Sequence, residues 1–315
     1  MIISASRRTD LPAWYSEWLF NRLKEEYVLV RNPVNFHQVR RISLSPSVVD
    51  GLVIWTKNPL PMLGRITELD KYNYYFQFTL TAYGPDVEPF IPPKREVLLP
   101  AFKKLSQAVG RERVVWRYDP LFFSARYTAE YHVKSFRYLA EQLCGCTEKC
   151  TLSFFDAYRH LAANIKRLGI IPASREQQFE LLAKFAYIAG EYGLKLDTCA
   201  EAIDFSPLGI GRSACIDKAR LERLGGYKLD IRKDPYQREA CGCAASIDIG
   251  AYDTCSGGCL YCYANHSGSI VRRRRGQHEA GAPLLFGEIG AHDAVAGAKE
   301  KSCKVGQMGL FDTNL

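Results

Sequence analysis

The sequence lacks the segments that would direct a chain to a membrane or through one. None of its apolar runs approaches the ~20 residues that a membrane-spanning helix needs. The first ten residues, MIISASRRTD, lack the ordered charged, apolar and small-residue regions of a signal peptide. We therefore expect a cytoplasmic protein with no membrane partner.

Two further patterns are missing. The sequence contains no internal repeat, so the chain is not built from stacked repeat units. Its six histidines are scattered and none forms a ligand pair. The formal net charge of +8 counts every thiol as neutral, and thiolates bound to a metal would lower it. The basic surplus is therefore weak evidence for nucleic-acid binding.

Cysteine, in contrast, is abundant. The chain has 315 residues and eleven cysteines. A cytoplasmic compartment keeps thiols reduced, so clustered cysteines indicate metal ligands or catalytic groups in place of a disulfide framework. The hydrophobic share of 47% and charged share of 24% are those of a globular protein, with one large α/β domain or two smaller ones.

Short β-rich runs alternate with amphipathic helical segments along most of the chain. Asp10 is a candidate helix N-cap, Ser174 and Gln177 form a candidate capping box, and Gly110 is a candidate C-cap. A hairpin is expected over 27–32 and 38–45. The other expected strands are 1–6, 51–56, 74–84, 113–120, 151–155, 194–199 and 246–252. This alternation predicts a mainly parallel sheet, as a complete or partial TIM-like β/α barrel or as a doubly wound sheet.

Polar and reactive side chains follow nearly every expected strand. They include Arg7–Asp10, Thr56–Asn58, Thr79 and Thr81, Arg117 and Asp119, Ser153–Asp156, Cys199–Glu201 and Cys255–Cys262. Because the carboxyl ends of parallel strands meet at one edge, these groups are expected to converge there as an active site. Loops are often polar for no functional reason, which is the alternative explanation.

The composition changes after residue 265. We expect 1–265 to form the folded unit, and 266–315, rich in Gly, Ala and charge, to be a loosely ordered tail with at most one short helix.

Three cysteines lie within eight residues in the segment DTCSGGCLYCYAN. Cys255, Cys259 and Cys262 have the spacing Cys-x3-Cys-x2-Cys, and Gly257 and Gly258 allow the backbone to wrap closely. Three thiolates can hold three corners of a 4Fe–4S cluster and leave one iron open. A structural zinc site normally has four ligands in other spacings.

This signature resembles that of the radical S-adenosylmethionine (SAM) enzymes. Four further segments, SASRRTDLPAWYSEW, IWTKNPLPML, FTLTAYG and VVWRYDP, resemble successive strand ends of the spore photoproduct lyase-like branch. Here the cysteine strand comes last instead of first. The chain over 1–265 thus resembles a circularly permuted radical SAM barrel and is similar to a bacterial domain-of-unknown-function family.

The resemblance implies a 4Fe–4S cluster on Cys255, Cys259 and Cys262, with SAM chelated by the open iron and Tyr261 near the adenine. Reductive cleavage of SAM would give a 5′-deoxyadenosyl radical, and a ferredoxin or flavodoxin would supply the electron. Since no clear Gly-Gly-Glu segment is present to hold the SAM amino group, candidate SAM contacts are Thr9 and Asp10.

Other residues at the strand ends are candidates for catalysis. We single out Lys57, Arg117 and Asp119, although an Arg117–Asp119 ion pair is equally consistent with a structural role. Lys57 is also a candidate contact for SAM.

Four more thiols precede or follow the last strands. Cys199, Cys215, Cys241 and Cys243 suffice for an auxiliary 4Fe–4S cluster, or they are ordinary buried cysteines. A third set, Cys144, Cys146 and Cys150, follows a helix away from the strand ends, and we favour a purely structural role for it.

The tail carries two candidate interaction segments. Gln307–Phe311, QMGLF, resembles the peptide by which bacterial proteins dock on the replication sliding clamp. Arg272–Arg275 is a basic block that can contact phosphates. With the resemblance, these segments favour a radical SAM enzyme of DNA repair or nucleic-acid modification. The alternative is a non-catalytic iron–sulfur or zinc protein that serves as an electron carrier or clamp-associated sensor.

Overall fold

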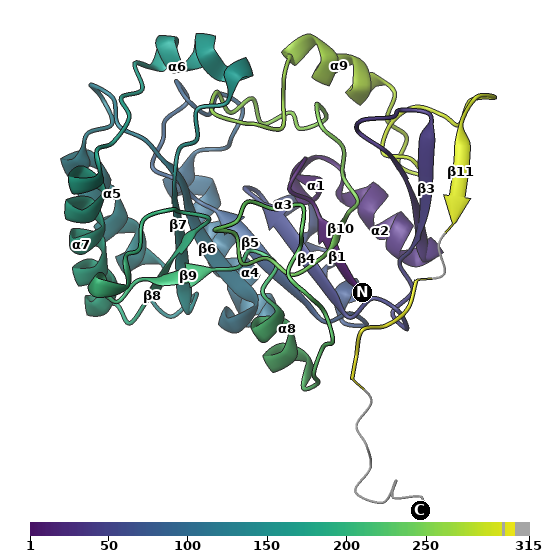
Figure 1. The fold of residues 1–315 in the computed structure, drawn as a ribbon, viewed down its shortest axis with the longest axis horizontal. Coiled ribbons are helices and arrows are strands. Elements are labelled where there is room, and N and C mark those ends of the chain that lie inside the picture. The colour runs from purple at the N-terminus through teal and green to yellow at the C-terminus, as the bar shows by residue number, and fades with distance from the viewer. Residues whose placement is uncertain (298–299, 306–315) are drawn as a thin grey trace, which may run out of the picture.

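Eight parallel strands form the main sheet of the computed structural model, which describes residues 1–297 and 300–305 (Figure 1). In spatial order the strands are β10 (Ile247–Asp248), β1 (Ile2–Ala5), β4 (Gly51–Thr56), β5 (Tyr74–Thr79), β6 (Val114–Leu121), β7 (Lys149–Phe154), β8 (Lys195–Cys199) and β9 (Gly211–Ser213). Helices flank the sheet, so the predicted α/β class with a parallel sheet is confirmed.

The strand order follows the chain from β1 to β9 without reversing direction. The last strand, β10, then pairs in parallel with β1, with Ile247 opposite Ile3. In the described part of the chain, β10 and β9 are the two edges of this sheet. Because every pairing in this sheet is parallel, the carboxyl ends of all these strands share one edge.

The helices begin where local sequence signals place them. Asp10 caps α1 by accepting the N–H of Ala13, and Ser174 and Gln177 form the predicted capping box of α7. Gly110, with φ at +91°, follows α4. The helices are α1 (Leu11–Trp14), α2 (Ser16–Glu25), α3 (Leu60–Leu63), α4 (Leu99–Val109), α5 (Ala129–Gln142), α6 (Ala162–Leu168), α7 (Arg175–Glu191), α8 (Lys218–Gly225) and α9 (Gly268–Gly276). Short helical turns are η1 (Ile66–Leu69), η2 (Lys94–Leu98), η3 (Arg111–Arg113), η4 (Arg159–Leu161) and η5 (Ser206–Leu208).

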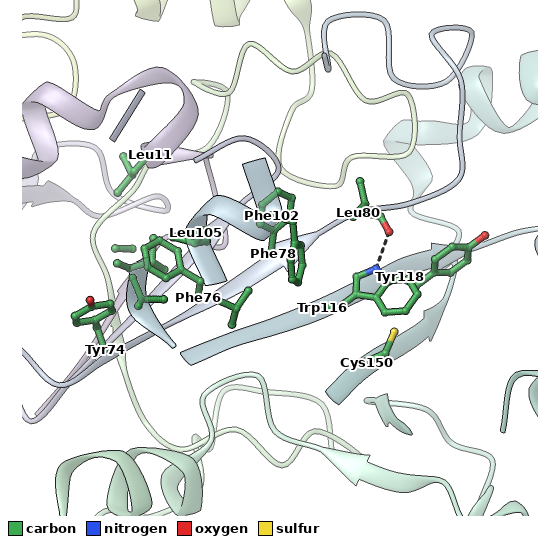
Figure 2. Close-up of a cluster of buried hydrophobic side chains, with 14 of the residues drawn as sticks. Leu11, Tyr74, Phe76, Phe78, Leu80, Phe102, Leu105, Trp116, Tyr118 and Cys150 are labelled. Carbon is green, nitrogen blue, oxygen red and sulfur yellow. Dashed lines mark hydrogen bonds between the residues drawn. The ribbon is translucent and has the colours of Figure 1, made fainter. Parts of the chain in front are cut away.

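Alternate residues of the central strands build the main core (Figure 2). Phe78 of β5 packs on Phe102 of α4, with ring centroids 4.7 Å apart. Trp116 of β6 stacks on Phe136 of α5, which in turn stacks on Phe185 of α7. These side chains face the helices because successive residues of a strand point to opposite faces of the sheet.

The intervening residues of the same strands face a second, smaller core. Val53, Tyr75 and Val115 pack there against Cys215 and Ile216. The chain between β9 and β10 supplies Cys215, Ile216, Leu221, Leu229, Cys241 and Cys243 to this cluster. One face of the sheet is therefore covered mainly by helices, and the other by an irregular segment that carries cysteines.

A separate three-stranded sheet lies beside the main one. The predicted hairpin is confirmed as β2 (Tyr27–Arg31) and β3 (Gln38–Ser43), and β11 (Ala294–Gly297) pairs in parallel with β3. Figure 1 shows β11 on the outer edge of this sheet.

The chain after residue 265 is more ordered than predicted. Gly268–Gly276 form α9, and Ala294–Gly297 form β11. Between them, Leu284 and Leu285 are buried. Trp18 donates its indole N–H to the carbonyl of Ala282 at 2.9 Å. The expectation of a loose tail from residue 266 is wrong for 266–297, because composition alone does not reveal the apolar pair that anchors it.

Several strand boundaries also differ from the predictions, among them the end of β5, which stops at Thr79. β6 continues through Pro120 to Leu121, with a register shift against β7 after Tyr118. Proline is tolerated at such an irregularity because no ladder hydrogen bond is needed there. The last strand of the main sheet, β10, is only two residues long.

Trp116 offers a test of the packing on the helical face. Its indole N–H donates to the carbonyl of Leu80 at 2.9 Å, and its side chain is fully buried (Figure 2). We expect Trp116→Phe to lower the free energy of unfolding by about 1–3 kcal/mol, since the hydrogen bond is lost and a cavity forms. Urea unfolding measures this, with exposed Tyr187→Phe as the control. Equal midpoints for the two variants would contradict this packing.

Candidate metal centre

The segment with three closely spaced cysteines forms a closed loop after β10. The N–H of Asp253 donates to the carbonyl of Ala264 at 2.9 Å and joins the two ends of the loop. The side-chain amide of Asn265 donates to the carbonyl of Cys255 at 2.7 Å. These two bonds hold residues 253–265, called the cysteine loop below, in one compact turn.

Three neighbouring segments fix the cysteine loop over the carboxyl edge of the sheet. The hydroxyl of Tyr15 donates to the carbonyl of Thr254 at 2.6 Å. The N–H of Leu260 donates to the carbonyl of Val87, in the chain that follows β5. Asn164 of α6 donates its side-chain amide to the carbonyl of Leu260 at 2.8 Å.

The basic block on α9 also holds the loop. Arg274 donates to the carbonyl of Tyr252 and Arg275 to the hydroxyl of Ser256. The guanidinium of Arg275 lies over the ring of Trp14, 5.0 Å from its centroid. Two members of the predicted phosphate-binding block are thus engaged in protein contacts, while Arg272 and Arg273 are exposed.

Two of the three loop thiols lie beside Gly257, and the charge of the third, Cys262, acts on both. A Cβ atom at Gly257 would lie 3.6 Å from the Sγ of Cys255 and 3.8 Å from that of Cys259. The N–H of Cys262 donates to the carbonyl of Cys259 at 3.0 Å. Gly258 has φ at +66°, a conformation that glycine adopts without steric cost. The two glycines therefore do what the sequence predicts: one leaves room beside the sulfurs and the other turns the backbone.

Burial opposes ionisation of these thiols. It raises the pKa of Cys255 to about 12, with the nearby Asp10 carboxylate acting in the same direction. Burial likewise raises the pKa of Cys259 and of Cys262. Thiols in such surroundings become thiolates only when a metal or cation offsets their charge. The site therefore does not present a free catalytic thiolate.

One cation beside the loop comes from Lys57, after β4. Its ammonium is 2.8 Å from Oε1 of Glu88 and lies over the ring of Tyr261 at 5.5 Å. This charge acts against the burial that raises the pKa of Cys259. Lys57 thus lies near the Cys259 thiol, and its roles in catalysis and in SAM binding stay predictions.

Glu88 is the site residue that sequence reasoning missed. It is 1% exposed and forms ion pairs with Lys57 and Lys94, while Thr81 donates to it at 3.0 Å. The hydroxyl of Tyr261 donates to the same carboxylate. The trio of Lys57, Glu88 and Lys94, called the lysine–glutamate network below, carries a net charge of +1 next to three potential thiolates. The only sequence signal was an acidic residue in the apolar segment PDVEPFIPP.

The two candidate SAM contacts after β1 have different environments. Asp10 is occupied by the cap of α1 and by the N–H of Lys57 at 2.7 Å, and burial raises its pKa to about 6. Thr9 is 4% exposed, and its hydroxyl has no hydrogen-bond partner in the described part of the chain. Thr9 therefore has an unused buried hydroxyl, whereas Asp10 already serves the fold.

Tyr261 lies in an aromatic cluster. Its ring centroid is 5.8 Å from that of Tyr83 and 6.5 Å from that of Phe122, and the side chain is buried. Its hydroxyl is engaged by Glu88, and burial raises its pKa well above the ordinary value. The ring is thus held rigidly beside the thiols.

The predicted Arg117–Asp119 ion pair is confirmed on β6. Arg117 is almost fully buried and also donates, through Nη1, to the Sγ of Cys215 at 2.9 Å. Gln77 donates to the carbonyl of Cys215 at 2.9 Å. Arg117 thus contacts a second group of thiols on the face of the sheet opposite to the main core.

That second group consists of the four cysteines predicted for an auxiliary site. The sulfurs of Cys199 and Cys215 are 3.0 Å apart. Cys243 acts on the pKa of both Cys215 and Cys241, so it lies near both. These four residues, called the four-thiol group below, thus lie close together.

The third cysteine set stays apart from both groups. Cys150 points from β7 into the main core, Cys144 is exposed, and Cys146 is half-buried after α5. This agrees with the structural role favoured from the sequence.

Within residues 1–297 and 300–305, no three Cys, His, Asp or Glu side chains converge as ligands of a single metal ion. Ligands of a cuboidal cluster bind separate iron corners and need not converge on one point. For the loop thiols, the number and spacing of the donors fit such a cluster.

Two further findings concern interactions with other molecules. Among the described residues, no helix has both the length and the apolarity to cross a bilayer. The predicted clamp-docking segment, Gln307–Phe311, lies outside the described residues.

The part of the chain that matches a known family includes both thiol groups. A family model described as "Domain of unknown function (DUF1848)" matches residues 2–264. The chain belongs to this family. The searches of curated proteins and of solved structures found no match. The matched span includes the cysteine loop through Cys262 and the whole four-thiol group, whereas α9 and β11 lie beyond it.

Proposed function

We propose that this member of the family is a radical SAM enzyme, with a 4Fe–4S cluster on Cys255, Cys259 and Cys262. The observation that carries the proposal is the cysteine loop at the carboxyl edge of a parallel sheet, which holds two thiols beside Gly257 and the third close to both. Three thiolate ligands leave the fourth iron corner open for the amino and carboxylate groups of SAM.

The strand order supports a partial barrel of the radical SAM type. Strands β1 to β9 follow one another in the sheet, and the strand that leads into the cysteine loop joins beside β1 although it is last in the chain. That placement is what a circular permutation of a barrel with the cluster strand first would produce. The proposed cluster then lies over the carboxyl ends of the strands, where β/α barrels have their active sites.

A cluster held by these three thiolates and reduced by a ferredoxin or flavodoxin would supply the one electron that splits SAM into methionine and a 5′-deoxyadenosyl radical. The protein's own residues position the partners. The lysine–glutamate network places positive charge beside the thiolates. The free hydroxyl of Thr9 is a donor for SAM, and Tyr261 gives an apolar surface for its adenine.

Aromatic side chains near the loop favour a nucleic-acid substrate. Tyr158 and Tyr263, each about two-fifths exposed, lie 5.7 Å apart between ring centroids. His160 and His266 lie 4.6 Å apart. Exposed rings stack on unpaired bases, and neighbouring guanidiniums attract phosphates.

If these aromatic side chains bind nucleic acid, single-stranded oligonucleotides will bind with salt-dependent affinity, and Tyr158→Ala with Tyr263→Ala will weaken that binding. Equal binding by this double variant would contradict the proposed substrate class.

SAM cleavage tests the enzymatic proposal. Protein purified without air, loaded with ferrous iron and sulfide and reduced with dithionite should convert SAM to 5′-deoxyadenosine and methionine. The control is the same mixture without protein. Protein that binds iron and sulfide but leaves SAM intact would contradict the proposal and would match the electron-carrier alternative instead.

A further inference from the structure

A second set of thiols lies on the face of the sheet opposite the main core, apart from the cysteine loop. We propose that Cys199, Cys215, Cys241 and Cys243 hold a second, four-thiolate 4Fe–4S cluster. The proposal does not depend on SAM cleavage, because it concerns different thiols.

The fold brings the four cysteines together from distant parts of the sequence. Cys199 ends β8, Cys215 follows β9, and Cys241 and Cys243 lie just before β10. Backbone bonds hold these segments together, as the N–H of Ala244 donates to the carbonyl of Ile216 at 3.0 Å. A cluster here would therefore connect the two edges of the open sheet, β9 and β10.

The chemistry of the four sulfur donors also favours a cluster. The group contains four thiols, of which Cys215, Cys241 and Cys243 are buried. Sites with only sulfur ligands bind zinc or iron–sulfur clusters and not hard cations. The close pair Cys241 and Cys243 is separated by one residue, whereas structural zinc sites pair cysteines two to four residues apart. An iron–sulfur cluster is therefore favoured.

Hydrogen-bond donors and positive charges around the sulfurs favour a cluster as well. Arg117 donates to the Sγ of Cys215 at 2.9 Å, and the N–H of Ile216 donates to the Sγ of Cys243 at 3.4 Å. Arg7, from the segment after β1, is the other cation near Cys215 and Cys243. Donors to sulfur and neighbouring cations stabilise the negative charge that a thiolate-bound cluster carries. Asp119 and Asp248 pair with these two arginines and hold them in place.

The same contacts relate the two thiol groups. The hydroxyl of Tyr263, next to Cys262 in the cysteine loop, donates to the carbonyl of Arg7 at 2.8 Å. Arg7 thus contacts the cysteine loop through its backbone and lies near the four-thiol group through its side chain. Both thiol groups are accordingly at the same end of the sheet.

The distance between the sulfurs of Cys199 and Cys215 shows what must change before a cluster can bind. Their sulfurs, 3.0 Å apart, are too far for a disulfide of about 2.05 Å. They are also closer than two ligands of one zinc ion, which lie about 3.8 Å apart for tetrahedral bonds of ~2.3 Å. Ligands on separate iron corners of a cuboidal cluster lie farther apart still, so loading the cluster requires the cysteine side chains to turn away from one another.

The test uses a full-length variant without the first site, Cys255→Ala with Cys259→Ala and Cys262→Ala. After anaerobic reconstitution with ferrous iron and sulfide, this triple variant should retain about four irons and four sulfides per chain. Adding Cys241→Ala and Cys243→Ala should remove them, whereas adding exposed Cys144→Ala should not. Circular dichroism will show whether the variants fold.

Three results would overturn the proposal. They are a folded triple variant that binds no iron or sulfide, one that binds a single zinc ion, and one in which mass spectrometry finds a Cys199–Cys215 disulfide without metal. Failure of the wild-type protein to cleave SAM would not affect this inference, since the triple variant measures the second site alone.

As a second measurement on wild-type protein, iron and sulfide loading should protect Cys241 and Cys243 from alkylation. Equal labelling of these two thiols before and after loading would also contradict the proposal.

Discussion

Cys259→Ala should reduce SAM cleavage to the level of the protein-free control. Cys259 is half-buried beside Gly257, and its charge is opposed by burial and supported by Lys57. With only two thiolates left in the loop, the cluster loses a corner ligand and the iron becomes labile. The measurement is formation of 5′-deoxyadenosine by chromatography, together with iron and sulfide content.

Cys144→Ala is the matched control, because that thiol is exposed and contacts neither thiol group. It should leave both iron content and SAM cleavage unchanged. If the second cluster is present, Cys259→Ala should still retain about four irons per chain at that site. Full SAM cleavage by Cys259→Ala would contradict the assignment of the loop as the catalytic cluster site.

Glu88→Ala should lower the free energy of unfolding of the metal-free protein by about 3–5 kcal/mol. The change removes the carboxylate that pairs with Lys57 and Lys94 and leaves two largely buried ammonium groups unpaired. It also removes the acceptor for the hydroxyl of Tyr261. Urea unfolding measures the loss, and exposed Glu96→Ala on the adjacent helical turn is the control, expected within about 0.5 kcal/mol of the wild type.

The same residue gives the wild-type protein a dependence on pH. Although burial opposes its ionisation, the two lysines lower the pKa of Glu88 from 4.5 to about 2. A lowered pKa in the folded state means that the stabilisation is complete above pH 4.5 and is lost as the pH falls toward 2. The linkage is on the order of 3 kcal/mol, and Glu88→Ala should lack this contribution. A stability that falls equally steeply in the wild type and in Glu88→Ala would contradict the role of this network.

Local signals allowed much of the fold to be predicted. Asp10, Ser174 and Gly110 act within one helical turn, so their roles depend only on neighbouring residues. The strands of the parallel sheet were recognisable because their runs are apolar and end in turn residues. The position of β10 beside β1 depends on contacts between the two ends of the chain, so only the resemblance to a permuted barrel, and no local pattern, implied it.

The site was predictable to a similar extent. The spacing of Cys255, Cys259 and Cys262 identified the loop because metal ligands from one loop must be close in sequence. Glu88 was missed because its burial depends on lysines 31 residues before it and 6 residues after it. The anchoring of residues 282–284 against Trp18 was missed for the same reason, since contacts over more than 260 residues leave no local pattern.

Electron paramagnetic resonance of the reduced protein, before and after addition of SAM, tests the central claim most directly. If the loop thiols leave one iron corner open, the spectrum of the dithionite-reduced protein will contain a cluster signal whose g values change when SAM binds. The triple variant without the loop thiols will show no such change. A wild-type spectrum that contains a cluster signal but stays identical at saturating SAM would contradict the account.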